Sequence, residues 1–265
     1  MNQVLIISIG NELLSGKTVN TNSTFLAEKF TNLGLTVKKI ITIPDEKEIV
    51  VSELTNALRE KNYRIIIVTG GLGPTWDDST AKFLAETLNV PLKIHPEGIS
   101  IVTQRYHELY KKGLVDTEEI TSARKKMAYL PVGAQPIYNP VGTAPGIFFD
   151  HEPSNCWIFC LPGVPKEMQE MFSIIEPQFH DIQKKEHLEF YEENLIVPFT
   201  DESLLAPFLD QVRDKFNVWI KSLPKTYQER ENITLIISSS SDKSGEAKNL
   251  VLEAKKYLEL LIKSN

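Results

Sequence analysis

The sequence has little of what marks several large classes of protein. Its two cysteines, Cys156 and Cys160, are too few for a disulfide framework in a chain of 265 residues. No apolar run approaches the ~20 residues that span a bilayer. The amino terminus enters an apolar stretch without the basic segment of a secretory signal. We therefore expect a cytoplasmic protein that has no membrane partner.

Positive charge is also in short supply. The chain carries 29 Lys and Arg against 35 Asp and Glu, a formal net charge of −6, and no basic tract stands out. Proteins that bind a phosphodiester backbone gather Lys and Arg on one face, so nucleic acid is not an expected partner. The five histidines do not reach metal-ligand spacing, and a histidine metal site is not expected either.

Glycine is scarce in the last third of the chain. Only Gly245 follows residue 180, although the sequence contains 13 glycines. Loops that need a permissive backbone therefore belong to the first part. We predict a first domain over residues 1–180 that carries the chemistry, and a second domain over residues 184–265 that serves packing or oligomerisation.

Short apolar runs alternate with helical patterns at the start of the first domain. The expected strands are 4–9, 37–43 and 65–68, each followed by a helix. This βαβαβα order predicts an α/β domain with a mostly parallel sheet and helices on both faces. Ligands of such sheets bind at the carboxyl ends of the strands.

The rest of the first domain is less regular. A helical stretch is expected from Glu97 to about Ala128. Three strands are then expected at 135–138, 147–149 and 157–161, for which an antiparallel direction is open, followed by a helix over 166–179. Cys156 and Cys160 flank an apolar run, so both side chains are expected on one face of that strand.

The second domain has a strand, helix, strand, strand, helix order, which predicts a small α+β module. Its two helices, 202–216 and 245–262, carry apolar residues at i, i+3 and i+4. A module of ~80 residues can bury only part of such surface by itself. We therefore expect it to pack on the first domain or on a second subunit, and we predict a homo-oligomer, in the simplest case a dimer.

The segment Gly10-Asn11-Glu12-Leu13-Leu14-Ser15-Gly16-Lys17-Thr18 follows an apolar strand and ends like a phosphate-binding P-loop. A P-loop has four residues between its glycines, whereas this segment has five. Glu12 also puts negative charge where a triphosphate would lie. We reject the P-loop interpretation, and an ordinary strand-to-helix turn stays open as the alternative.

A second segment, Thr69-Gly70-Gly71-Leu72-Gly73-Pro74-Thr75-Trp76-Asp77-Asp78-Ser79-Thr80, is more specific. Its glycines let the backbone approach a phosphate, and a helix N-terminus follows. Two adjacent carboxylates would repel that phosphate unless a cation lies between them, so the segment indicates phosphate together with a divalent metal. The structural alternative is that Asp77 or Asp78 only caps the helix.

Three further segments lie where ligands are expected. Asp45 follows the strand 37–43 and is a candidate metal ligand or water-orienting base, with helix capping as the alternative. Asn139-Pro140-Val141-Gly142-Thr143-Ala144-Pro145-Gly146 and Leu161-Pro162-Gly163-Val164-Pro165-Lys166-Glu167 supply two more loops. In the latter, Lys166 could reach a phosphate and Glu167 can complement the positive end of the helix.

The four segments 10–18, 69–80, 139–146 and 161–167 together resemble the CinA family. The amino-terminal domain of that family is similar to the molybdopterin-binding fold of MogA, MoaB and MoeA. The resemblance covers residues 1–180 and implies a three-layer α/β/α domain. For the CinA branch it implies hydrolysis of the pyrophosphate in ADP-ribose with a divalent metal, for which we expect magnesium. The acids of the molybdopterin enzymes correspond to Asp45 and Asp78.

Two departures from the family limit what the resemblance implies. Many bacterial members continue into a nicotinamide-mononucleotide deamidase domain, which we do not expect here. Those members also tend to have Lys-Gln-Ala before the Pro-x-Gly turn, where this chain has Arg124-Lys125-Lys126-Met127-Ala128, and part of the substrate pocket is therefore expected to differ. The second domain resembles the KH-like module of some members, but it has no Gly-x-x-Gly loop to clamp a nucleotide backbone.

Three functions follow as hypotheses: a metal-dependent nucleotide pyrophosphatase acting on a small molecule such as ADP-ribose, a molybdopterin-binding or adenylyl-transferring protein, and a noncatalytic ligand-binding scaffold. The expected catalytic residues are Asp45 and Asp78, and the expected metal ligands are Asp45, Asp77 and Asp78. The residues expected to bind substrate or phosphate are Gly10, Asn11, Glu12, Gly70, Gly71, Leu72, Gly73, Pro74, Thr75, Thr80, Gly142, Thr143, Ala144, Gly163 and Lys166.

Overall fold

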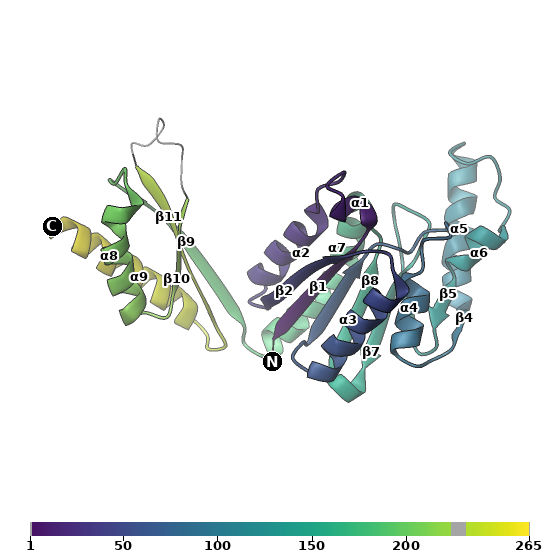
Figure 1. The fold of residues 1–265 in the computed structure, drawn as a ribbon, viewed down its shortest axis with the longest axis horizontal. Coiled ribbons are helices and arrows are strands. Elements are labelled where there is room, and N and C mark those ends of the chain that lie inside the picture. Colours follow the sequence, from purple (N-terminus) through teal and green to yellow (C-terminus); the bar gives the residue numbers. More distant parts are fainter. Residues whose placement is uncertain (1, 224–231, 265) are drawn as a thin grey trace. The chain divides into compact units, whose positions relative to one another are not determined.

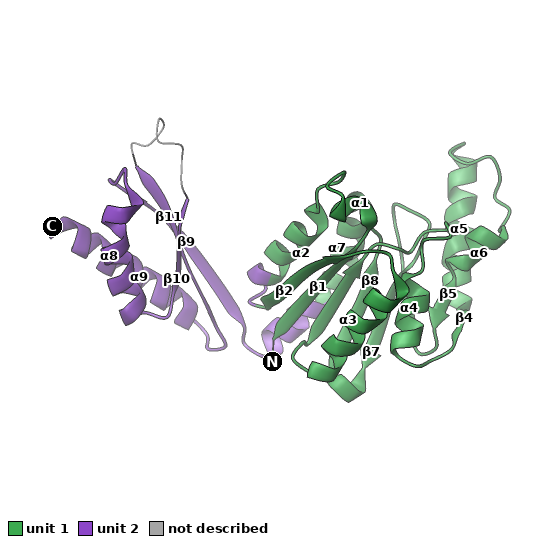
Figure 2. Cartoon of the chain, in the orientation of Figure 1, with its two compact units in different colours: residues 1–30, 35–177 green, residues 31–34, 178–265 purple. Residues whose placement is uncertain are grey.

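The computed structural model describes residues 2–223 and 232–264. The chain forms two compact units (Figure 2). The first comprises residues 1–30 and 35–177, and the second comprises residues 31–34 and 178–265.

The first unit is built on a six-stranded sheet with the order β2-β1-β3-β8-β7-β6. Its strands are β1 (Gln3–Ile9), β2 (Thr36–Ile43), β3 (Ile65–Thr69), β6 (Gln135–Ile137), β7 (Gly146–His151) and β8 (Cys156–Leu161). The strands β2, β1, β3 and β8 are parallel, and β7 runs antiparallel to both of its neighbours. Of the later strands, only β7 therefore opposes the first group.

Helices cover both faces of this sheet (Figure 1). Leu5, Ile7 and Ile9 of β1 belong to one core cluster with residues of α3 (Lys47–Glu60) and α4 (Thr80–Thr87). Successive residues of a strand point to opposite faces, so Val4 and Ile6 lie on the other side. There α2 (Thr21–Asn32) contacts α7 (Pro165–Lys185) through Phe30 and Phe172. The three-layer α/β/α arrangement is confirmed.

The expected helix from Glu97 to Ala128 is wrong as one element. The helix α5 (Pro96–Lys111) ends at the glycine turn around Gly113, whose φ is +67°, and a short α6 (Ser122–Lys126) follows a connecting loop. The strands that flank these helices in the chain, β4 (Leu92–Ile94) and β5 (Tyr129–Pro131), pair as a two-stranded antiparallel sheet. A left-handed glycine interrupts a helix, and periodicity alone did not reveal it.

Two local features complete the first unit. Cys156 and Cys160 share one face of β8 and one core cluster, as the spacing predicted, and burial raises the pKa of each thiol to about 12.

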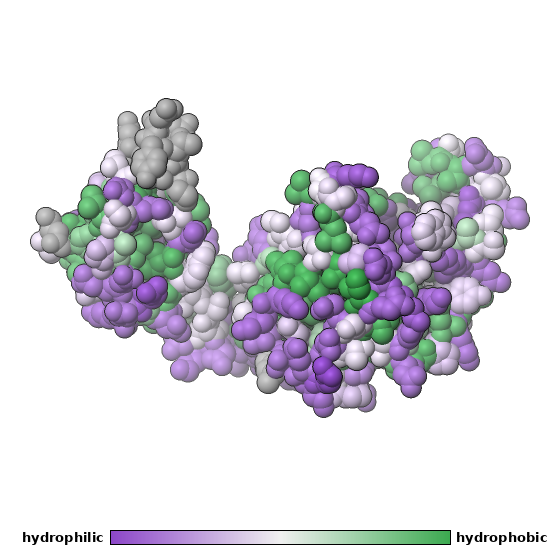
Figure 3. Space-filling model, viewed as in Figure 1, coloured by the Kyte–Doolittle hydropathy of each residue, from purple (hydrophilic) through white to green (hydrophobic). Residues whose placement is uncertain are grey.

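Figure 3 shows apolar side chains gathered on the surface over the edge strand β2, where Ile40 is exposed.

The second unit is an α+β module. Its antiparallel sheet has the order β10-β11-β9, formed by β9 (Glu189–Val197), β10 (Trp219–Leu223) and β11 (Ile233–Ser241). The helices α8 (Glu202–Lys215) and α9 (Glu246–Lys263) pack on one face of it and form their own core with it. The apolar faces of both helices are therefore largely covered within this unit. Among the described residues, no helix is long and apolar enough to cross a membrane.

Candidate functional site

The loops after four neighbouring parallel strands surround one cleft of about 540 Å³. The loops follow β1, β2, β3 and β8, and the loop between β6 and β7 closes the remaining side. The carboxyl ends of these strands meet at one edge of the sheet, which is why segments far apart in sequence come together there. The predicted site residues that line the cleft are Gly10, Glu12, Asp45, Gly70, Gly71, Leu72, Gly73, Pro74, Asp77, Asp78, Gly142, Thr143, Ala144 and Gly163.

Four predicted residues lie elsewhere. Lys166 is exposed on α7 and is not among the residues that line the cleft. Thr80 is buried, and its hydroxyl donates to the carbonyl oxygen of Gly70 at 2.8 Å. Asn11 and Thr75 contact cleft carboxylates from behind. Thr80, Asn11 and Thr75 therefore hold the walls of the cleft in place.

The glycine loop after β3 passes very close to the end of β1. Gly70 has a φ of +106° and Gly71 a φ of +67°, both in the left-handed region that favours glycine. A Cβ at Gly70 would collide with the carbonyl oxygen of Ile9, and one at Gly71 would collide with the Thr80 hydroxyl. Only glycine fits at these two positions, so the backbone itself forms the floor of the cleft.

Asp78 does not cap the helix that follows it. The N-cap of α4 is Ser79, and no side chain donates or accepts a capping bond there. Instead, the Asp78 carboxylate accepts hydrogen bonds from the backbone N–H of Thr75 at 3.0 Å and from its hydroxyl at 2.5 Å. The capping interpretation is wrong, and the turn from Thr75 to Asp78 presents the carboxylate to the cleft.

Asp45 is held from the opposite side. Its carboxylate accepts from the backbone N–H of Asn11 at 3.3 Å, and the N-cap of α3 is Glu46. Burial raises the pKa of Asp45, and the negative charges of Glu12, Asp77 and Asp78 raise it further against the opposing effect of the Asn11 N–H. Four carboxylates therefore interact electrostatically across this cleft.

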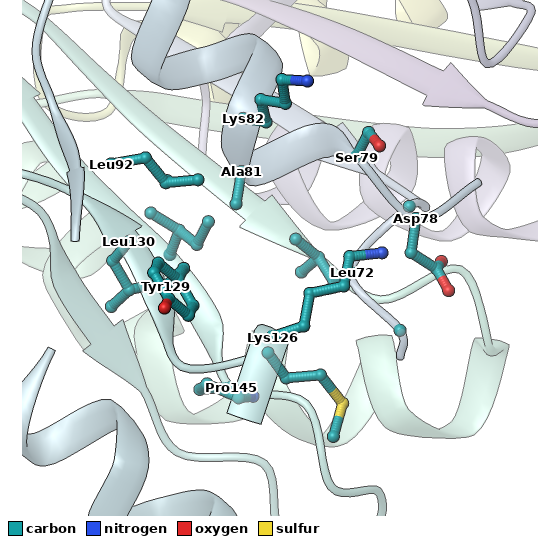
Figure 4. Close-up of a pocket in the computed structure, with 14 residues that line it drawn as sticks. Leu72, Asp78, Ser79, Ala81, Lys82, Leu92, Lys126, Tyr129, Leu130 and Pro145 are labelled. Carbon is teal, nitrogen blue, oxygen red and sulfur yellow. The ribbon is translucent and has the colours of Figure 1, made fainter. Parts of the chain in front are cut away.

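Asp77 lies at the rim. The neighbouring Thr75 hydroxyl lowers the pKa of Asp77, and the positive charge of Lys126 contributes in the same direction. The Lys126 ammonium donates to the carbonyl oxygen of Thr75 and so ties α6 to the acidic loop (Figure 4). Trp76, beside Asp77, is 90% exposed.

The loop between β6 and β7 is organised by a buried asparagine. The Asn139 amide donates to the carbonyl oxygen of Ala144 at 2.9 Å and to the Glu167 carboxylate at 2.7 Å. Its oxygen accepts from the N–H groups of Val141 and Gly142. Behind this loop, Arg105 donates to the carbonyl oxygens of Val141 and Gly142 at 2.8 Å each.

Glu167 is the main residue that sequence analysis missed as part of the site. It lies in the first turn of α7 and lines the cleft, where a Cβ at Gly142 would collide with its carboxylate. The sequence assigned it to the helix dipole, although its place after Leu-Pro-Gly-Val-Pro was the available signal. Thr18, Met127, Pro162 and Val164 also line the cleft without having been predicted.

The donor set suits a hard divalent cation. The described cleft residues include five carboxylates, Glu12, Asp45, Asp77, Asp78 and Glu167, and no Lys or Arg. Carboxylate oxygens are the ligands that Mg²⁺ prefers, and it commonly binds one or two of them together with substrate phosphates and water. Within residues 2–223 and 232–264, no three His, Cys, Asp or Glu side chains converge into a ready-made cage.

Comparison with known proteins shows which class of domain the chain contains. Residues 5–181 match the family described as "Probable molybdopterin binding domain". A protein of Pyrococcus abyssi is 42% identical over 226 residues, 84% of this chain and 85% of its own length. A protein of Saccharolobus solfataricus is 38% identical over 255 residues, 95% of this chain and 88% of its own length. The fold and the cleft thus define a protein with a molybdopterin-binding type of α/β domain.

A solved structure narrows the assignment. The protein CinA of unknown function from Thermoplasma acidophilum matches with a TM-score of 0.58 and 32% identity, over 67% of this chain and 98% of that one. The chain therefore belongs to the CinA family within the molybdopterin-binding domain class, as the motifs had indicated.

Proposed function

We propose that the protein is a metal-dependent hydrolase of a nucleotide pyrophosphate, with ADP-ribose as the preferred substrate. The observation that carries this proposal is the pairing of a close-approach glycine loop with five carboxylates around one cleft. Such a cleft repels a bare diphosphate and attracts one that brings a divalent cation with it.

Two parts of the cleft would hold the cation and the diphosphate. Asp78 and Asp77 would hold the cation, for which Mg²⁺ is the proposed identity. The bound cation would supply positive charge that offsets the charge of the phosphates. The backbone N–H groups from Gly71 to Gly73, which line the cleft, would place the diphosphate by donating to its oxygens.

Asp45 would orient the attacking water and accept its proton. Its raised pKa makes it a better proton acceptor than an ordinary Asp carboxylate. One P–O bond forms from water and the bridging P–O bond breaks, so ADP-ribose gives AMP and ribose 5-phosphate. The proton passes from water to Asp45 and then to solvent.

A substrate panel tests the proposal. The full chain is incubated with ADP-ribose, NAD, FAD, nucleoside triphosphates and molybdopterin, each with added Mg²⁺ or with chelator. The expected result is metal-dependent hydrolysis with ADP-ribose as the best substrate. Tight binding of molybdopterin without hydrolysis of any pyrophosphate would overturn it.

Binding of molybdopterin without hydrolysis would favour a second candidate function, that of a molybdopterin-binding protein. The family description that matches residues 5–181 is a molybdopterin-binding one. A molybdopterin-binding or adenylyl-transferring protein would use the same cleft. A noncatalytic scaffold, a cytoplasmic location and a homo-oligomeric state stay predictions.

A further inference from the structure

One guanidinium lies behind the wall of the acidic cleft. The described residues that line the cleft include five carboxylates and no Lys or Arg, although the substrate proposed for it is an anion. Arg105 of α5 is only 5% exposed and is not among those lining residues. Burying an arginine this deeply costs free energy unless its donors are paired, so its partners indicate what it does.

Two partners of Arg105 are consecutive carbonyl oxygens of the loop between β6 and β7. Its Nε donates to the carbonyl oxygen of Gly142 at 2.8 Å, and its Nη2 donates to that of Val141, also at 2.8 Å. Its Nη1 pairs with the Glu108 carboxylate at 2.5 Å. The planar guanidinium thus holds two neighbouring peptide groups in one orientation, which the single ammonium group of a lysine cannot do.

The same two peptide groups turn their N–H groups the other way. In a trans peptide the N–H and C=O bonds point in opposite directions, so the N–H groups of Gly142 and Thr143 point away from Arg105. That of Gly142 donates to Asn139 Oδ1 at 2.8 Å. The N–H of Thr143, a residue that lines the cleft, donates to no acceptor in the part of the chain that the structure describes.

An N–H group with no protein acceptor at an acidic cleft can donate to a phosphate oxygen. Successive N–H groups on one side of a turn attract anions, and hydrogen bonds to the carbonyl side of the same peptides polarise them further. Arg105 therefore makes this wall more positive from behind. A lysine or arginine inside the cleft would instead pair with the carboxylates and compete with the metal for them.

We propose that Arg105 is a positioning residue that turns the Thr143 N–H towards a phosphate oxygen of the substrate. It acts through the backbone from Val141 to Thr143 and touches neither the substrate nor the cation. The inference rests on the proposed function, because it names a donor for the diphosphate on the wall that the loop between β6 and β7 forms.

Binding of inorganic diphosphate with Mg²⁺, measured by calorimetry on the full chain, tests this role without catalysis. Arg105→Gln should bind diphosphate at least about tenfold more weakly than the native chain, because the Thr143 N–H is no longer held. Arg105→Lys keeps the charge but loses the fork and should bind several-fold more weakly. Arg64→Gln is the matched control, since Arg64 donates to the carbonyl oxygen of Asn155 at 3.0 Å and neither residue lines the cleft.

A merely structural role of Arg105 gives a different result. Arg105→Gln would then melt at a lower temperature and bind diphosphate at a reduced stoichiometry, but with the native dissociation constant. A native dissociation constant in both Arg105 variants would therefore overturn the inference.

NMR of the native chain decides even if Arg105→Gln does not fold. The ¹H–¹⁵N signal of Thr143 should shift when diphosphate and Mg²⁺ are added, because its N–H gains an acceptor. In Arg105→Gln or Arg105→Lys the same signal should shift less. An unshifted Thr143 signal in the native chain, or no binding of diphosphate at all, would overturn the inference.

Two results distinguish this inference from the proposed function. If diphosphate binding depends on Arg105 but the native chain hydrolyses no ADP-ribose, the positioning role stands and the proposed function is wrong. If ADP-ribose is hydrolysed and Arg105→Gln keeps the native kcat and KM, the proposed function stands and the positioning role is wrong.

Discussion

The side-chain amide of Asn139 donates a hydrogen bond of 2.7 Å to the carboxylate of Glu167, which lies 28 positions further along the chain. This bond joins the loop before β7 to the first turn of α7. It fixes one wall of the cleft, because the same asparagine also organises Val141, Gly142 and Ala144.

Replacing this asparagine should destabilise the protein. Asn139 is fully buried, and Asn139→Ala leaves several polar groups without their partner. We expect a loss of about 3 kcal/mol in the free energy of unfolding, measured by urea denaturation. Asn249→Ala, an exposed position in α9, is the control and should change little. An unchanged midpoint for Asn139→Ala would show that the loop does not depend on this residue.

Asp45 should make the metal-free chain less stable at neutral pH. Its pKa in the folded state is raised above the ordinary 3.8, chiefly by burial, so folding favours its protonated form. The stability that this provides is complete below pH 3.8 and is lost as the pH rises through the raised pKa. In chelator at pH 7, Asp45→Asn should therefore melt at a higher temperature than the native chain.

Added Mg²⁺ should reverse that order. A ligand that binds only the folded state stabilises it, so Mg²⁺ is expected to raise the melting temperature of the native chain and to raise that of Asp45→Asn less. Equal melting temperatures for both proteins in chelator would contradict the raised pKa of Asp45, because the ionised carboxylate would then not destabilise the fold.

Lys17 should be dispensable. It is exposed and is not among the residues that line the cleft, and Gly10 is followed by a short helix α1 (Asn11–Leu14) in place of a P-loop. We expect Lys17→Ala to keep turnover within about tenfold of the native value, a change of under ~1.4 kcal/mol in barrier. If the native chain hydrolyses ATP and this variant does not, the P-loop interpretation returns.

The second unit should mediate dimer formation through its open sheet face. Ile196 and Leu223 both lie beside Thr234 in the register, and Trp219 lies on the same face of β10. Ile196 is 66% exposed and Trp219 is 58% exposed. Light scattering should report a dimer for the native chain and a monomer for Ile196→Glu. Leu204→Glu, on the exposed side of α8, should stay dimeric, and a monomeric native chain would contradict the prediction.

Much of this arrangement could be predicted from sequence because it depends on local pattern. The apolar runs 4–9 and 65–68 form buried parallel strands, and the glycines at 70 and 71 adopt the left-handed backbone of a tight loop after the second of them. The position of Asp45 and Asp78 in one cleft could also be predicted, since residues that follow parallel strands meet at one edge of the sheet. These inferences needed only short segments and one topological rule.

What sequence did not give depends on contacts between distant segments. The role of Asn139 requires Glu167 beside it, and no local pattern reveals that pairing. Lys166 and Glu167 are adjacent in sequence, yet only the second lines the cleft, because the rotation of α7 decides which side chain faces it. The cleft itself is likewise assembled from the loops after β1, β2, β3 and β8 together with the loop between β6 and β7.

The most direct test of the account is the hydrolysis of ADP-ribose by the native chain and by Asp78→Asn, followed by ³¹P NMR with Mg²⁺ and with chelator. An asparagine at this position can still accept the hydrogen bonds of Thr75, so the fold is retained and only the charge is lost. Asp116→Asn, an exposed position outside the cleft, is the control. The account predicts Mg²⁺-dependent formation of AMP and ribose 5-phosphate, reduced at least about a hundredfold in Asp78→Asn. Equal turnover in excess chelator, or full activity of Asp78→Asn, would contradict it.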